Sequence, residues 1–509
     1  MEEKIIKTNV LVNDVLFNET AELPIDVDFS LPDFCPDISK ILKCRAVSRI
    51  SSKSINGKNI TVDGCVCITV LYCDETGKLC SYEYQYPFSK NLEMSEEGGS
   101  ANLCCRTKCE YINCRAVTGR KIDIHGAVSI SVRVFRRKGT DIISDIDDPN
   151  IEQRRGTAPA TIPMGYSEKY LMVEEDIAIG QGQPTIGRIL RCDAKPCVRE
   201  SKIINDKTVV KGDMAVWILY SPEDEGAPQC VKTVIPFSQI IDMEGITDSC
   251  ECETKSETAF LEIKPKSGEG GAKCFSLTAK LLLSCEAFCG NDIAVLLDAF
   301  SRKYMADIKK ERISFNKICD SVSEIFHCKK NIELDEPVSS VTDLWCDMQS
   351  VNTKFENENM LVNGTVIACV LACAGTGEAV YFEKPIDFEY KYPLKAPSSA
   401  LHCTPEIDIS SCGYTIMSAE NIELRIDLSV NAAIYNCLDM PLITEIRVDE
   451  GRPAEITAKC AMTIYFTGAG ECVWDIAKHY NASTEEIMKI NELESECLPE
   501  GKMLLIPAL

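Results

Sequence analysis

The sequence has few of the residues on which enzymes and metal proteins most often depend. It contains only four histidines, and its 29 cysteines include no Cys-x-x-Cys motif. It also lacks a Walker loop, His-Glu-x-x-His, Gly-x-Ser-x-Gly and a dinucleotide-binding fingerprint. We therefore predict no catalytic residues, no metal site and no cofactor. An enzyme remains the rival class, because abundant acidic residues leave a pair of catalytic carboxylates open.

Positive charge and long apolar runs are scarce as well. Lys and Arg number 54 against 78 Asp and Glu, which gives a net charge of −24. Nucleic acids and anionic lipid surfaces would repel such a chain, so we expect no nucleic-acid partner. No run of 18 apolar residues occurs, and the first 17 residues lack a basic segment followed by an apolar one. We expect neither a transmembrane segment nor a signal peptide, and a protein that stays where it is made.

The cysteines suit neither of the two common structural uses of thiols. A disulfide framework requires an oxidising compartment, and a zinc site requires closely spaced pairs of thiolates. The densest cluster, Cys104, Cys105, Cys109 and Cys114, is poorly spaced for a tetrahedral metal site. We interpret the cysteines as reduced, small apolar residues of the core.

A glycine-centred pattern occurs three times. In residues 55–72, 204–220 and 355–371, a turn signal is followed by alternating apolar residues, which is typical of a hairpin with a half-buried strand. The glycines of these segments are Gly64, Gly212 and Gly364, spaced by 148 and 152 residues. Because glycine inside a strand is costly, each indicates a bulge or a close approach of two backbones.

Three further markers recur in the same order and with a similar period. They are Cys44, Cys192 and Cys346 upstream, then Pro87, Pro236 and Pro385, and finally Phe135, Phe288 and Tyr435 at the ends of alternating strands. Four markers with one period indicate a module that is present three times. We predict that each module is β-rich and sandwich-like, with the repeated cysteines in its core.

These patterns define a mainly β fold with a small α+β domain at the end. We place the three modules at residues 1–150, 160–290 and 321–455, and the last domain at residues 460–509. Residues 141–161 are polar and rich in turn signals, and are interpreted as a linker. Residues 291–320 are predicted to form an amphipathic linking helix, because Ile293, Leu296, Leu297 and Phe300 have helical spacing.

Two family resemblances follow from these residues. The triplicated pattern, together with residues 298–301 (DAFS) and Tyr304, resembles the SPOCS module of spore-coat-associated proteins. The last domain is predicted to have the order strand, helix, helix, strand. Its residues resemble a LysM domain: Tyr465, Gly470, Trp474, Ile476, Ala477, Tyr480, Asn491, Leu493, Gly501, Leu504, Ile506 and Pro507.

The LysM resemblance implies a recognition site in two loops, before the first helix and after the second. The corresponding residues are Gly470, Glu471, Cys472, Val473, Asn491, Glu492, Leu493 and Glu494. LysM domains commonly bind N-acetylglucosamine glycans, and their first loop usually reads Gly-Asp-Thr-Leu. Here Cys472 replaces the threonine, and a thiol is a much weaker hydrogen-bonding group than a hydroxyl. This departure favours a protein ligand over a sugar.

Three SPOCS-like modules followed by a LysM domain resemble the SipL family of spore coat morphogenetic proteins. The resemblance implies a non-catalytic scaffold that binds the coat ATPase SpoIVA through its LysM domain. It also implies a protein of the mother-cell cytoplasm that is recruited to the forespore surface and tethers the coat there. The alternative is a cell-wall or cortex protein that binds peptidoglycan through N-acetylglucosamine.

Overall fold

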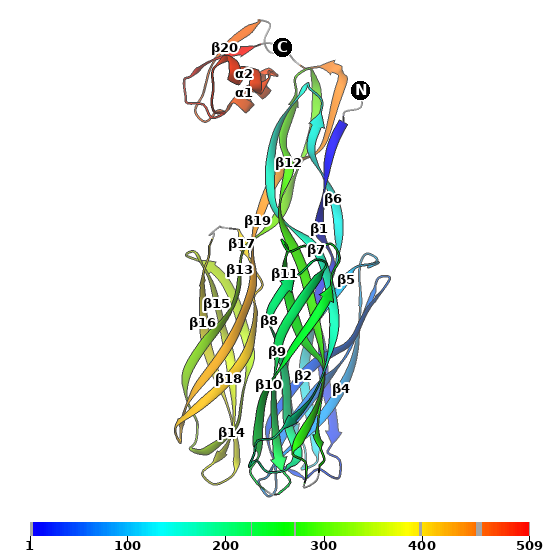
Figure 1. The fold of residues 1–509 in the computed structure, drawn as a ribbon, viewed down its shortest axis with the longest axis vertical. Coiled ribbons are helices and arrows are strands. Elements are labelled where there is room, and N and C mark those ends of the chain that lie inside the picture. The colour runs from blue at the N-terminus through cyan, green and yellow to red at the C-terminus, as the bar shows by residue number, and fades with distance from the viewer. Residues whose placement is uncertain (1–3, 225, 269–270, 396–399, 455–460, 508–509) are drawn as a thin grey trace.

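The computed structural model describes residues 4–224, 226–268, 271–395, 400–454 and 461–507. Up to residue 453 its regular elements are all β-strands, and they form three successive units (Figure 1). The predicted mainly β fold is therefore confirmed.

Unit 1 is a two-layer sandwich of antiparallel strands. One sheet has the strand order β1-β6-β5 and the other β2-β3-β4. The strands span Lys4–Ser30 (β1), Ile38–Asn56 (β2), Asn59–Asp74 (β3), Leu79–Glu93 (β4), Asn102–Ala116 (β5) and Lys121–Asp147 (β6). Ile60 and Ile68 of one sheet and Ile124 of the other share a single buried core.

Units 2 and 3 repeat this arrangement. Their sheets have the orders β7-β12-β11 and β8-β9-β10 in unit 2, and β13-β19-β17 (with β18 also pairing β19) and β14-β15-β16 in unit 3. The strands of unit 2 span Ile151–Ala178 (β7), Ile186–Ile203 (β8), Lys207–Pro222 (β9), Gln229–Asp242 (β10), Glu251–Lys266 (β11) and Cys274–Ser301 (β12). Those of unit 3 span Tyr304–Glu333 (β13), Val338–Glu356 (β14), Asn359–Ala374 (β15), Ala379–Pro393 (β16), Leu401–His402 (β17), Glu406–Ser418 (β18) and Asn421–Pro453 (β19).

The repeated glycine has the same environment in each unit. The strand registers place Gly64 opposite Phe88, Gly212 opposite Phe237 and Gly364 opposite Phe388. A Cβ atom at any of the three glycines would lie closer than 3.0 Å to the phenylalanine ring and to a carbonyl oxygen of the other neighbouring strand. The predicted close approach of backbones is confirmed. The third proline marker, Pro385, was wrong by two residues. Phe388, and not Ile386, is equivalent to Phe88, so Asp387 occupies the position of Pro87.

The predicted linking helix at residues 291–320 is wrong. These residues lie in β12 and β13, which pair with β7 and β19 and are joined by a short turn. The register of β12 shifts between Leu296 and Asp298. This shift moves the apolar residues to the other face of the strand and produces spacings of three and four by chance.

The predicted linker at residues 141–161 is wrong as well. β6 runs to Asp147, β7 begins at Ile151, and Asp148 accepts a hydrogen bond from the Asn150 N–H at 2.8 Å in the turn between them. Pro149 lies in this turn, and Pro159 is tolerated in the sheet because β7 is an edge strand. The units therefore meet at residues 147–151 and 301–304, and not at 150–160 and 290–321. The predicted limits at 455 and 460 lie outside the described residues.

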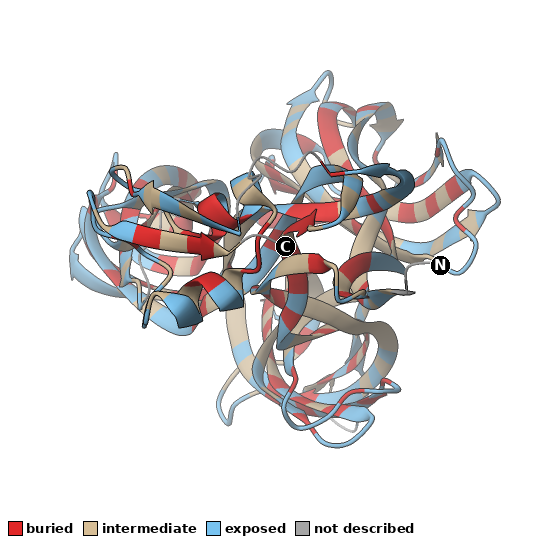
Figure 2. Ribbon diagram, turned by 90° about the horizontal axis from the view of Figure 1, so that it is seen from above, coloured by how far each residue is buried: buried red, intermediate tan, exposed pale blue. Residues whose placement is uncertain are grey.

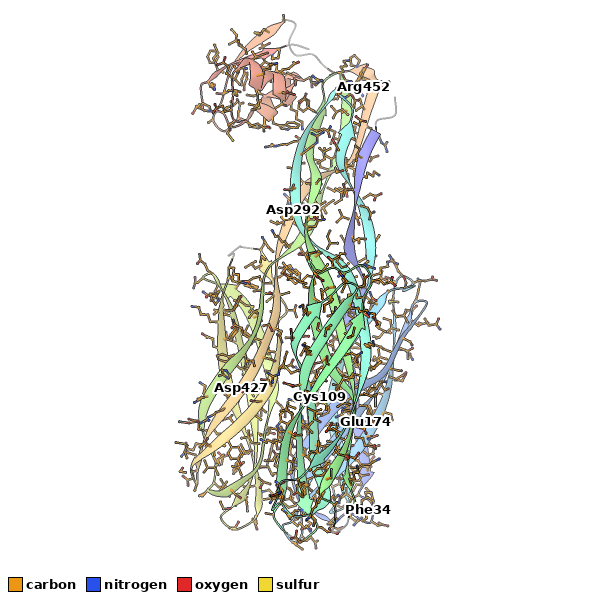
Figure 3. All side chains as sticks on the ribbon, viewed as in Figure 1. Phe34, Cys109, Glu174, Asp292, Asp427 and Arg452 are labelled. Atoms are coloured by element: carbon orange, nitrogen blue, oxygen red, sulfur yellow. The ribbon has the colours of Figure 1, made fainter. Side chains whose placement is uncertain are left out.

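The longest strands continue past their sandwiches into a shared stalk. Register shifts adjoin Phe135, Phe288 and Tyr435, where the sequence suggested that alternating strands end. Beyond them the six strands β1, β6, β7, β12, β13 and β19 share apolar clusters that include Ile142, Ile293 and Leu442, one residue from each unit. Arg452 lies at the tip of this stalk and Phe34 at the opposite end of the molecule (Figure 3).

Equivalent residues of the three units meet between the sandwiches, which Figure 2 shows grouped around a common centre. Arg45, Asp193 and Asp347 each follow a repeated cysteine, and Arg45 lies 2.5 Å from the Asp193 carboxylate and 3.6 Å from that of Asp347. Ion pairs therefore join the three units where they meet at a threefold-like centre. All three units also line a cavity of about 940 Å³ beside it.

Candidate recognition site in the C-terminal domain

The last domain has the predicted order of strand, helix, helix and strand. β20 spans Met462–Phe466, α1 Val473–Tyr480, α2 Thr484–Ile490 and β21 Met503–Pro507. Asn481 ends α1 in the left-handed conformation, with φ = 51°. The hydroxyl of Ser483 accepts a hydrogen bond from the Glu486 N–H at the start of α2. Neither helix has the length or the apolar character of a membrane-spanning segment, and no other helix is found in the described part of the chain.

The first predicted loop is held by its own side chains. The Glu471 carboxylate accepts hydrogen bonds from the Tyr465 hydroxyl at 2.7 and 2.8 Å and from the Gly468 N–H at 2.8 Å. The Gly468 N–H and the Tyr465 hydroxyl lower the pKa of Glu471 below its usual value. The Cys472 thiol donates to the Asp475 carboxylate at 3.0 Å.

Val473 is wrong as a contact residue of this loop. Its side chain is 0 % exposed and belongs to the core of the domain, because it occupies the first position of α1 on the face that packs inward. Gly470, in contrast, is exposed and has φ = 79°, a conformation that favours glycine. Of the first loop, residues 470–472 remain as candidate contacts.

The second predicted loop also contains both side chains that stabilise the domain and side chains that are exposed. The Asn491 amide group donates to the carbonyl oxygens of Ile487 and Leu505 and its oxygen accepts from the Leu505 N–H, at 2.7–2.8 Å. This side chain therefore joins α2 to β21. Leu493 is half-buried against the core, whereas Glu492 and Glu494 are exposed.

Trp474 is covered by the stalk. Its side chain is only 3 % exposed, and the Phe300 ring lies edge-on to the indole. The indole N–H donates to the Asp298 carboxylate at 2.9 Å, and Lys478 lies 2.8 Å from the same group. Burial by itself would raise the pKa of Asp298, but hydrogen bonds from Lys310, Lys478 and Trp474 lower it to about 2. The motif that suggested a linking helix is thus where the C-terminal domain docks on the stalk.

An apolar sheet face was missed by the loop-centred prediction. β20 and β21 pair Met462 with Pro507, Ile464 with Leu505 and Phe466 with Met503, and these six residues define the outer sheet face. Ile464 and Phe466 are 61 % and 64 % exposed. The alternation of Met462, Ile464 and Phe466 in the sequence carried this signal, because the positions between them already supply the face that packs inward.

One group among the described residues has the geometry to hold a metal ion. Asp26, Asp123 and His125 lie close together on the β1–β6 surface of unit 1. The His125 ring nitrogens lie 3.2 Å from each carboxylate, so contacts between the imidazole and the two carboxylates account for the arrangement.

Comparison with known families gives two matches. The model of the SipL SPOCS domain matches residues 37–117 and 185–266, and that of the LysM domain matches residues 468–507. The SPOCS matches begin just before β2 and β8 and reach the ends of β5 and β11, which are equivalent strands of units 1 and 2. No curated protein and no solved structure matched the chain. The chain is a SipL-like, sporulation-related protein with SPOCS modules and a C-terminal LysM domain.

Proposed function

We propose that this chain is a non-catalytic scaffold of spore coat assembly that binds the coat ATPase SpoIVA through its LysM domain. In this role it acts in the mother-cell cytoplasm, is recruited to the forespore surface and helps tether the coat there. The partner is taken from the resemblance to SipL proteins. The SPOCS and LysM matches support the assignment to the coat.

The exposed apolar side chains of the outer sheet face are the observation that supports binding to a protein. Exposed side chains such as Ile464, Phe466 and Met503 gain most from burial against another apolar surface. A small LysM domain exposes roughly 3,400 Å². A standard interface needs about 800 Å² from each partner, so this face and the adjoining loops suffice.

The negative charge of the C-terminal domain indicates what kind of protein surface it would bind. Residues 460–509 contain eight acidic residues and three lysines, and Glu492 and Glu494 are exposed at the second loop. An apolar ridge flanked by lysines or arginines would complement this domain in both respects. We propose that residues 470–472 and 492–494 line the edge of this contact.

Glycan binding has less support from the geometry. The Cys472 thiol is directed to Asp475, the indole of Trp474 is covered by Phe300, and the Asn491 amide bonds within the domain. The groups that would stack on a sugar or hydrogen-bond to it are therefore engaged elsewhere.

A paired pull-down tests the proposal. The full chain is offered to purified SpoIVA and to insoluble peptidoglycan, alongside Glu471→Lys, Leu493→Ala and Ile464→Asp. Phe260→Asp, at an exposed phenylalanine of unit 2, is the matched control. We expect capture of the ATPase that weakens in the three LysM variants but not in the control. Retention on peptidoglycan that depends on the loops, without capture of the ATPase, would move the protein to the glycan-binding class.

A further inference from the structure

Cys472 and Cys497 face each other within the LysM domain. An isolated antiparallel bridge pairs the two residues. The Val473 N–H donates to the Glu496 carbonyl at 2.9 Å, which makes Cys472 and Cys497 a non-hydrogen-bonded pair. In such a pair the Cα atoms lie about 4.5 Å apart and the side chains converge. A disulfide requires Cα atoms about 4.4–6.8 Å apart, so the backbone suits one.

Among the cysteines that the structure describes, this is the only pair joined by a β-bridge, whereas Cys44 and Cys114, Cys252 and Cys285, and Cys346 and Cys412 meet through their side chains. In the paired strands each cysteine faces a residue of another type; Cys44, for example, faces Val70, and Cys412 faces Ile426. Cys472 also stands where LysM sequences usually have threonine. A disulfide with Cys497 across the bridge would explain why a sulfur replaces that hydroxyl.

We propose that Cys472 and Cys497 form a disulfide when the protein meets hydrogen peroxide. Cys497 is exposed and reacts first: its sulfur attacks the peroxide, the O–O bond breaks, and a sulfenic acid and one water are formed. The Cys472 sulfur then attacks the Cys497 sulfur. The Cys472 proton, passed through the adjacent Asp475 carboxylate, leaves with the displaced hydroxide as a second water. The two thiols lose two electrons and the peroxide gains both.

The bond would fix the geometry of the recognition loops. It joins the residue that precedes α1 to the segment that follows the second loop, and closes a ring through residues 473–496. A cross-link of this kind restricts the unfolded chain and stabilises the domain. It would act on the shape of the recognition domain whatever ligand that domain binds.

Peptide mapping of the oxidised full chain tests the site. Trypsin separates Cys472 and Cys497 into residues 460–478 and 490–502, and a Cys460→Ser background leaves one cysteine in each peptide. After hydrogen peroxide treatment and alkylation, we expect a linked pair of these peptides that dithiothreitol separates. The link should be absent in Cys497→Ser, whose side chain is exposed, and retained in Cys289→Ser. If both peptides stay unlinked under conditions that oxidise Cys289, the proposal is overturned.

Discussion

The ring of Phe300 lies edge-on against the indole of Trp474, with the ring centroids 5.2 Å apart. Phe300 belongs to β12 in the stalk, and Trp474 to α1 of the LysM domain. Phe300 is also a member of the buried cluster that forms the LysM core. A side chain of the stalk therefore completes the core of the recognition domain, which lies beside the tip of the stalk (Figure 1).

Removing this contact should loosen the domain. An aromatic pair of this geometry contributes about 0.5–1.5 kcal/mol beyond its buried area. We expect Phe300→Ala to speed amide hydrogen exchange in α1 about tenfold, which corresponds to about 1.4 kcal/mol. Phe260→Ala, at an exposed position of unit 2, is the control and should leave α1 unchanged. Equal exchange in both variants would contradict the docking role of Phe300.

The docking of the LysM domain on the stalk should also depend on pH. Hydrogen bonds from Lys310 of the stalk and from Lys478 and Trp474 of the LysM domain lower the pKa of Asp298 from 3.8 to about 2, and the part due to Lys478 and Trp474 means that the ionised form favours docking. This contribution is fully present above about pH 4 and is lost as the pH falls towards 2. Small-angle X-ray scattering should show the wild type extending over that interval. Asp298→Asn should already be partly undocked at pH 7 and change less with pH, and identical pH profiles would argue against Asp298 as the group responsible.

The repeated glycines should tolerate no side chain. A Cβ atom at Gly64, Gly212 or Gly364 would meet both a backbone carbonyl and a phenylalanine ring closer than 3.0 Å. We expect each alanine variant to lose about 1–3 kcal/mol of stability in chemical denaturation, as in other overpacked cores. Gly413→Ala in β18 is the matched control, because nothing lies within 4 Å of its Cβ position, and it should be neutral or slightly stabilising. Similar losses at all four positions would show that the close approach is not the cause.

A buried ion pair between units 2 and 3 makes a further test. Arg191 lies 2.7 Å from the Asp343 carboxylate and stacks on Trp345, and the two charged side chains are 3 % and 0 % exposed. Arg191→Met leaves Asp343 buried without its guanidinium, which should cost about 3–5 kcal/mol. Adding Asp343→Asn removes the isolated charge and should restore part of the loss. If the double variant is no more stable than the single one, the pair does not act as the structure indicates.

Sequence patterns predicted the parts of this fold in which neighbouring residues decide the structure. Asn481 ends the first LysM helix and Ser483 caps the start of the second, and both capping signals are visible in the sequence. The sandwiches were also evident, because burial on one face of a sheet leaves a period of two.

The stalk and the docking of the LysM domain were not predictable in this way. Register shifts beside Phe135, Phe288 and Tyr435 interrupt the period of two, so continuous strands resembled strand ends followed by a linker or a helix. The contact of Asp298 and Phe300 with Trp474 joins residues that are far apart in the chain, and no local pattern records it. The loop-centred prediction included Val473 and Asn491, which serve the domain itself, and it left out Ile464 and Phe466, which are exposed.

Calorimetric titration of SpoIVA with the full chain tests the central claim most directly. Wild type is compared with Ile464→Asp, whose side chain is 61 % exposed, and with Phe260→Asp, whose side chain is 46 % exposed. The account predicts binding by wild type and by Phe260→Asp with equal Kd, and at least about tenfold weaker binding by Ile464→Asp, a loss of about 1.4 kcal/mol or more. Equal affinity for all three proteins, or no binding by wild type, would contradict it.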